Sequence, residues 1–135
     1  MRQFSDKEKE KLELVNPRLV SVVNEAAKEI DIFVVCGHRD QHDQDLAFAQ
    51  GFSKVKFPNS KHNKSNYPNA KSDAVDLCPY PIDWNDHNKF YAIYRAMMNA
   101  SQKLGIKVRA GADFNQDGNL TNDKFIDLPH FELVD

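Results

Sequence analysis

Residues 123–135 read Asp123-Lys-Phe-Ile-Asp127-Leu-Pro-His130-Phe-Glu-Leu-Val-Asp135. The stretch places a carboxylate and an imidazole, Asp127 and His130, beside a short apolar run that predicts a strand. Far upstream, a second polar cluster contains His62 and Asp76. Two imidazoles and one carboxylate, from His62, Asp76 and His130, form the ligand set of a catalytic zinc site, which keeps a fourth position open for water. Asp127 is then the additional carboxylate that such a site needs to move a proton.

Length and composition indicate one globular domain. The chain has 135 residues, of which 28% are charged and 41% hydrophobic, so we expect a single catalytic domain over residues 1–135. The net charge of -2 gives no electrostatic reason to expect a nucleic-acid partner. No apolar run approaches the ~20 residues that span a bilayer, and the first residues lack the apolar segment of a secretory signal. We expect no membrane insertion and a monomer.

Two cysteines are too few for a disulfide framework. Cys36 and Cys78 each lie in or beside an apolar run, and the sequence contains no Cys-x-x-Cys pair. We therefore expect buried, reduced thiols and no thiolate zinc site.

Helix signals dominate the first fifty residues. Ser5-Asp-Lys-Glu8 matches a capping box and predicts a helix to about residue 15. Asn16-Pro17 starts a second helix, whose apolar positions recur at steps of three and four residues up to Ile30. A β-branched run over 32–36 predicts a buried strand, and a third helix is expected over 41–50. The polar residues 52–71 predict a long surface loop that carries His62, and loops of this length are usually functional.

The second half predicts strands around one long helix. A strand over 73–78 would alternate its side chains, so Asp73 and Asp76 point to opposite faces and only one can face a shared metal. Asn85 or Asp86 caps a helix that Gly105 ends. Further strands are expected over 106–109 and 131–134. The fold class is therefore α+β: a small, mostly antiparallel sheet with helices packed on one side and the zinc site at the sheet. We expect Trp84 in the core.

Three motifs together carry a family resemblance: Ser60-x-His62, Asp73-Ala-Val-Asp76 and Asp127-x-x-His130. In these motifs the chain resembles the zinc D-Ala-D-Ala carboxypeptidases and L-alanyl-D-glutamate endopeptidases, which share a hedgehog-like fold. It is most similar to the single-domain phage endolysins that cut L-alanyl-D-glutamate bonds. Gly37-His-Arg39, Ile82-Asp-Trp84-Asn-Asp86 and the segment 104–115 add to the resemblance, which covers nearly the whole chain.

Two departures from the family pattern lie between the first two ligands. Residues 63–75 separate His62 from Asp76, a longer spacing than the family has, and we interpret residues 63–71 as an insertion. The family glycine is Ser72 here. Loops tolerate added length at modest entropic cost, so these changes bear on loop geometry and substrate fit more than on metal binding.

The resemblance implies a role for each site residue. His62, Asp76 and His130 would hold Zn²⁺, and Asp127 would carry the proton from water to the leaving amine. Arg39 would stabilise the oxyanion or bind a substrate carboxylate; a structural salt bridge is the alternative. Asp127 could instead orient a ligand histidine. Asp73 is the less favoured metal ligand.

The implied function is hydrolysis of L-alanyl-D-glutamate bonds in peptidoglycan stem peptides by a zinc metallopeptidase. A D-alanyl-D-alanine carboxypeptidase or dipeptidase on the same scaffold is one alternative, and a non-catalytic, zinc-containing wall-binding module is another. As in phage lysis, such a protein would be made in the host cytoplasm without a signal peptide. It would reach the wall after the membrane is permeabilised.

A separate motif suggests calcium. Residues 113–119 match the first half of a calcium loop, with hard oxygen ligands and a glycine at the sixth position. Lys124 stands where the loop would have its bidentate Glu. We expect Ca²⁺ to act as a weak regulator here, or the segment to be a simple turn. The candidate ligands are Asp113, Asn115, Asp117, Asn119 and Asp123.

Overall fold

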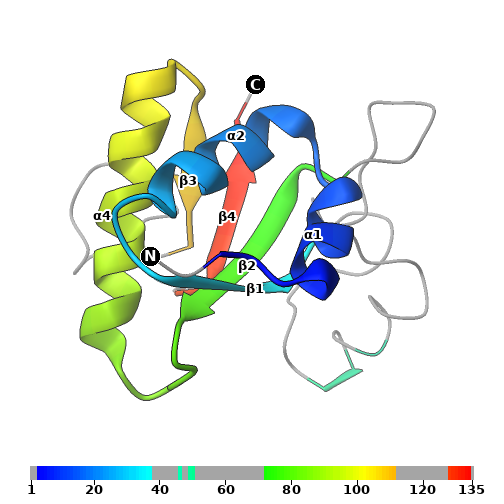
Figure 1. The fold of residues 1–135 in the computed structure, drawn as a ribbon, viewed down its shortest axis with the longest axis vertical. Helices are drawn as coiled ribbons and strands as arrows, with labels where there is room; N and C mark the ends of the chain where they lie inside the picture. Colours follow the sequence, from blue (N-terminus) through cyan, green and yellow to red (C-terminus); the bar gives the residue numbers. More distant parts are fainter. Residues whose placement is uncertain (1–2, 38–45, 47–48, 51–71, 112–127, 135) are drawn as a thin grey trace.

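The computed structural model describes residues 3–37, 46, 49–50, 72–111 and 128–134. The elements within these residues are α1 (Asp6–Glu13), α2 (Pro17–Ala26), β1 (Ile32–Cys36), β2 (Ala74–Pro79), α4 (His87–Leu104), β3 (Val108–Ala110) and β4 (His130–Leu133). The strands form one sheet in the order β1-β2-β4-β3, and each neighbouring pair is antiparallel. The last strand of the chain therefore lies inside the sheet, between β2 and β3 (Figure 1).

Helices α1, α2 and α4 begin where their capping residues predict, and α4 also ends at the predicted glycine. Ser5 and Glu8 form both hydrogen bonds of a capping box at the start of α1. Asn16 caps α2 through its side chain, and Asp86 does the same for α4. Gly105, in the left-handed conformation with φ of 67°, follows the last residue of α4.

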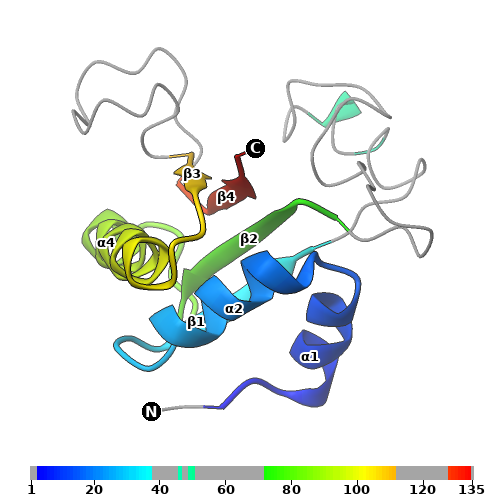
Figure 2. The ribbon, with the colours of Figure 1, turned by 90° about the horizontal axis from the view of Figure 1, so that it is seen from above.

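One face of the sheet forms the core with the helices. Val75 and Leu77 on β2 and Phe131 and Leu133 on β4 point to one face of the sheet and pack in a single buried cluster with side chains of α1, α2 and α4. α2 crosses in front of the sheet, and α4 runs along its β3 side (Figure 1). Seen from above, α1 and α2 lie on the same side of β2 (Figure 2). The α+β architecture, with an antiparallel sheet and helices on one face, is as the sequence predicts.

Strand alternation leaves a second face with different chemistry. Asp76 on β2 and His130 and Glu132 on β4 occupy the positions between the core residues, and Arg109 does so on β3. The helices among the described residues cover the opposite, apolar face. The sheet thus separates the packed core from a polar cluster.

Several element boundaries differ from the sequence prediction. α2 ends at Ala26 rather than near Ile30, yet Ile30 still packs against the core from the turn that follows. The apolar spacing therefore continues beyond the end of the helix, because it follows the residues that pack against the core. Strand β4 begins at His130, one residue before the expected start, because His130 pairs with Asp76. β3 is limited to Val108–Ala110, and most of the helix expected over 41–50 lies outside the described residues.

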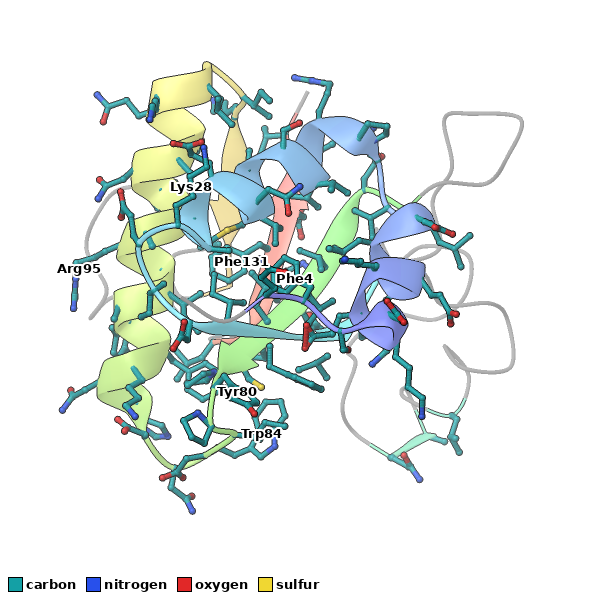
Figure 3. The ribbon with its side chains drawn as sticks, viewed as in Figure 1. Phe4, Lys28, Tyr80, Trp84, Arg95 and Phe131 are labelled. Atoms are coloured by element: carbon teal, nitrogen blue, oxygen red, sulfur yellow. The ribbon has the colours of Figure 1, made fainter. Side chains whose placement is uncertain are left out.

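Two expectations about burial are wrong. Trp84 is 51% exposed rather than in the core, because the connection after β2 projects beyond the sheet (Figure 3). Its ring still contacts Phe90, with ring centroids 5.7 Å apart. Both cysteines are free thiols as expected, but Cys36 is only partly buried, whereas Cys78 is buried.

The end of β1 touches the last turn of α1 at Gly37. A Cβ atom at this position would lie 2.6 Å from Cγ2 of Val15 and 2.9 Å from the carbonyl oxygen of Lys11. Glycine is therefore required for this close approach.

No helix in the described part of the chain is long and apolar enough to span a membrane.

Candidate metal centre

Asp76 and His130 face each other across β2 and β4. The two residues are register partners, and Oδ1 of Asp76 lies 3.4 Å from Nδ1 of His130. Both are buried, with 8% and 9% of their surface exposed. Backbone hydrogen bonds from Leu77 N to Pro129 O and from Gly111 N to His130 O hold the start of β4 on both sides. The imidazole is therefore positioned by the sheet itself.

The opposite edge of the His130 ring meets Glu132. Nε2 of His130 lies 2.7 Å from Oε1 of Glu132, and Oε2 of the same carboxylate accepts a hydrogen bond of 2.7 Å from Nη2 of Arg109. Glu132 is 4% exposed, whereas 37% of the Arg109 side chain is exposed. Side chains from three adjacent strands thus form a continuous row: Asp76, His130, Glu132 and Arg109.

The row shifts the pKa values of its members in opposite directions. Burial alone would lower the pKa of His130, but contacts with Asp76 and Glu132 and their negative charges outweigh burial and raise the pKa to about 9. Burial would raise the pKa of Glu132, but the hydrogen bond to His130 and the positive charges of His130 and Arg109 lower it to about 2. In the metal-free protein at neutral pH, His130 therefore carries a proton on each nitrogen and Glu132 is ionised.

The geometry at Asp76 and His130 fits two ligands of a zinc ion. Tetrahedral ligands at ~2.0–2.1 Å from zinc lie ~3.3–3.4 Å from one another, and Oδ1 and Nδ1 are 3.4 Å apart. Carboxylate oxygen and imidazole nitrogen are both ligands that zinc uses. The hydrogen bond of Nε2 to a carboxylate is the usual arrangement of a metal-binding histidine.

Asp73 occupies a different environment from Asp76. Its Oδ1 accepts a hydrogen bond of 3.2 Å from Nδ2 of Asn16, and its carbonyl oxygen accepts one of 2.9 Å from Leu133 N. Asp73 is buried and ties the residue before β2 to Asn16, which caps α2. The structure thus brings Asp76, and not Asp73, to His130.

The other predicted site residues lie outside the described residues. These are the expected ligand His62, the expected catalytic residues Asp127 and Arg39, and the candidate calcium ligands Asp113, Asn115, Asp117, Asn119 and Asp123. Within the described residues, no group of three or more His, Cys, Asp or Glu side chains could hold one metal ion. Asp76 and Glu132 lie at opposite edges of the His130 ring, so they cannot share an ion with it.

Two members of the row, Glu132 and Arg109, were not among the site residues predicted from the sequence. The signal for Glu132 was present, because residues two apart in a strand share a face, and Glu132 follows His130 by two. A strand that starts at Phe131 does not include His130, so the predicted bounds did not place Glu132 on the same face as His130. Arg109 could not be assigned in the same way, because its position opposite Glu132 depends on the pairing of β3 with β4.

An antiparallel sheet with helices on one face and an Asp–His pair on the other agrees with the wall peptidases suggested by the motifs. The chain belongs to the phage L-alanyl-D-glutamate peptidase family, whose pattern it matches over residues 1–134.

Two individual proteins resemble it over almost their whole length. The L-alanyl-D-glutamate peptidase of Escherichia phage T5 is 34% identical over 141 residues, which cover 98% of each chain. The crystal structure of the L-Ala D-Glu endopeptidase ChiX of Serratia marcescens superposes with a TM-score of 0.73 and 25% identity. The match covers 97% of the present chain and 89% of ChiX.

Proposed function

We propose that this protein is a zinc-dependent peptidase that hydrolyses L-alanyl-D-glutamate bonds in peptidoglycan stem peptides. The peptidase activity follows from family membership over residues 1–134 and from two similar proteins named for the same bond. One observation supports zinc as the cofactor: the buried Asp76 and His130 present ligand atoms 3.4 Å apart across two paired strands. His62 is the proposed third ligand.

The residues of the chain divide the work between binding and proton transfer. Bound zinc would supply a Lewis acid that polarises the scissile carbonyl and activates water near neutral pH. Asp76 and His130 hold their positions because the β2–β4 pairing fixes both backbones. In this proposal Asp127 takes the proton of the attacking water and delivers it to the leaving amine. Arg39 binds the developing oxyanion or a substrate carboxylate through its planar, permanently charged guanidinium group.

Digestion of purified peptidoglycan tests the bond that is cut. Mass spectrometry should find new N-terminal D-glutamate ends after incubation with the zinc-loaded protein. Release of free D-alanine instead would assign the D-alanyl-D-alanine carboxypeptidase activity. Absence of any new end, with wall binding retained, would assign a non-catalytic module.

Asp73 and Asp76, which are close in the sequence, provide a matched test of the metal site. Asp76→Asn should lose both bound zinc and activity, because it removes a ligand charge next to His130. Asp73→Asn makes the same chemical change at a buried carboxylate that faces Asn16, and the folded variant should keep its zinc. Zinc content measured by elemental analysis, with circular dichroism to check folding, separates the two. Equal zinc content in both variants would contradict the assignment of Asp76.

The proposed site of action is the bacterial cell wall, reached after the host membrane is permeabilised. We also propose that residues 113–123 hold Ca²⁺ weakly, with a dissociation constant on the order of 10⁻⁴–10⁻³ M. The segment lies just before Asp127 and His130 in the sequence. An ion there would stiffen the chain that carries both side chains.

A further inference from the structure

We infer that Glu132 and Arg109 act as a positioning pair that sets which nitrogen of His130 is presented to the metal. This inference rests on the zinc site proposed above and adds two residues that do not touch the ion. Its basis is the row of side chains that runs from Asp76 through His130 and Glu132 to Arg109.

The positions of the three side chains are fixed by the sheet. His130 and Glu132 are two residues apart in β4 and share one face, and Arg109 on β3 is the register partner of Glu132. Each oxygen of the Glu132 carboxylate has a different partner. Oε1 contacts Nε2 of His130 and Oε2 contacts Nη2 of Arg109, both at 2.7 Å. The carboxylate is therefore held from both sides.

Hydrogen-bond chemistry then determines the tautomer of the imidazole. An ionised carboxylate can only accept hydrogen bonds, so at 2.7 Å from Oε1 the Nε2 atom must carry the hydrogen. In a neutral His130 the lone pair consequently lies on Nδ1. This is the nitrogen that faces Oδ1 of Asp76. Glu132 thus keeps Nε2 as a hydrogen-bond donor, and Nδ1 is the nitrogen that can bind a cation.

Charge excludes the reverse arrangement, in which a cation binds between Nε2 and Glu132. The guanidinium group of Arg109 is always charged and lies 2.7 Å from the same carboxylate. Because Glu132 is buried, a metal ion placed there would meet this positive charge at short range. The metal is directed to the Asp76 side of the ring.

Nitrogen NMR of the isotope-labelled, zinc-loaded full chain tests the tautomer without any mutation. The His130 ring should show a hydrogen on Nε2 that exchanges slowly with water, and a metal-shifted Nδ1 without hydrogen. A hydrogen on Nδ1 together with a metal-shifted Nε2 would overturn the inference.

Zinc competition with a chelator tests the energetic role in solution. Glu132→Gln keeps the side-chain shape but removes the charge, and zinc affinity should fall by ~10–100-fold, the usual effect of losing such a partner. Arg109→Gln should weaken zinc binding less, and Arg109→Lys should recover part of that loss. Glu25→Gln is the matched control, because Glu25 is also a carboxylate that bridges two cations, Lys28 and Lys103, but lies on α2. The zinc affinity of the Glu25→Gln variant should equal that of the wild type.

The outcomes separate this inference from the proposed zinc site. If folded Glu132→Gln binds zinc as tightly as the wild type, Glu132 is only structural and the inference fails while the zinc site stands. If His130→Ala retains wild-type zinc affinity, the zinc site itself is wrong. If Glu132→Gln does not fold, the wild-type tautomer and the two Arg109 variants still decide the question.

Discussion

Raising the pH of the metal-free protein through the pKa of His130 should remove the stability that this residue contributes. The groups that face its ring among the described residues are Asp76 and Glu132, with Arg109 behind Glu132. Together the two carboxylates raise the pKa of His130 from 6.5 to about 9, although burial alone would lower it. A pKa that is higher in the folded state means that the folded protein binds the proton more tightly than the unfolded chain does.

The sign and size of the effect follow from this difference. The stabilisation is fully present below the unfolded pKa of ~6.5 and is lost as the pH rises through about 9. Each pKa unit corresponds to ~1.4 kcal/mol, so raising the pKa from 6.5 to about 9 contributes about 3 kcal/mol. Glu132 acts in the opposite direction: its pKa, lowered from 4.5 to about 2, gives stability that is present above pH 4.5 and lost in stronger acid. The contributions of His130 and Glu132 to the stability of the metal-free protein are therefore both fully present only between pH 4.5 and 6.5.

Urea unfolding of the chelator-treated protein at several pH values measures how the free energy of unfolding depends on pH. The free energy of unfolding should fall by about 3 kcal/mol between pH ~6.5 and ~9. His130→Gln should remove most of that slope, whereas His87→Gln at the exposed start of α4 should leave it unchanged. Zinc should also remove the decline, because the metal and the proton compete for the same nitrogen. A wild-type slope in His130→Gln would refute the reasoning.

Four other predictions concern the proposed chemistry, the close contact at Gly37 and the segment 113–123. Asp127→Ala should lower the rate of peptidoglycan cleavage by ~10²–10⁴-fold while elemental analysis still finds zinc; loss of zinc in parallel would make Asp127 a ligand or a ligand support. Activity should fall in mild acid and be partly restored by excess zinc, so full activity at low pH in metal-free protein would contradict a metallopeptidase. Gly37→Ala should reduce the free energy of unfolding by ~1–3 kcal/mol, and by less in a Val15→Ala background, because the added Cβ would meet Cγ2 of Val15; equal losses in both backgrounds would rule out this clash. Millimolar Ca²⁺ should raise activity without replacing zinc, and Asp117→Ala should abolish the response; an NMR titration of the zinc-loaded protein that moves no resonance in 113–130 would leave that segment as a turn.

Local signals in the sequence were sufficient for the helices and for most strands. The capping box at Ser5 and Glu8 and the glycine at 105 depend on neighbours within a few residues, so they can be identified without the fold. The predicted end of α2 lies several residues beyond the observed end at Ala26, because the spacing of apolar residues indicates which positions are buried and does not by itself indicate a helix. Ile30 is packed against the core from a turn, where the same spacing persists without a helix.

Strand order and cross-strand contacts could not be derived from local signals. The insertion of β4 between β2 and β3 joins segments far apart in the sequence, and their register is set by packing of the whole sheet. The family resemblance pointed to His62, Asp76 and His130 as metal ligands, and the structure brings Asp76 and His130 together. It offered nothing on Glu132 and Arg109, whose contact exists only because β3 and β4 pair in one particular register.

The final strand links the stability of the core to the geometry of the site. Along β4, Phe131 and Leu133 enter the core while His130 and Glu132 face the polar row. Phe131 is fully buried and lies near the middle of the view in Figure 3. Because the polar and apolar side chains share one short backbone, a shift of that strand into or out of the core moves both ends of the His130–Glu132 hydrogen bond together. The strand's two sheet neighbours carry Asp76 and Arg109. Close packing of the core therefore holds Nδ1 of His130 in place beside Oδ1 of Asp76, and, within the residues that the structure describes, the sheet positions the polar row without any additional layer of structure.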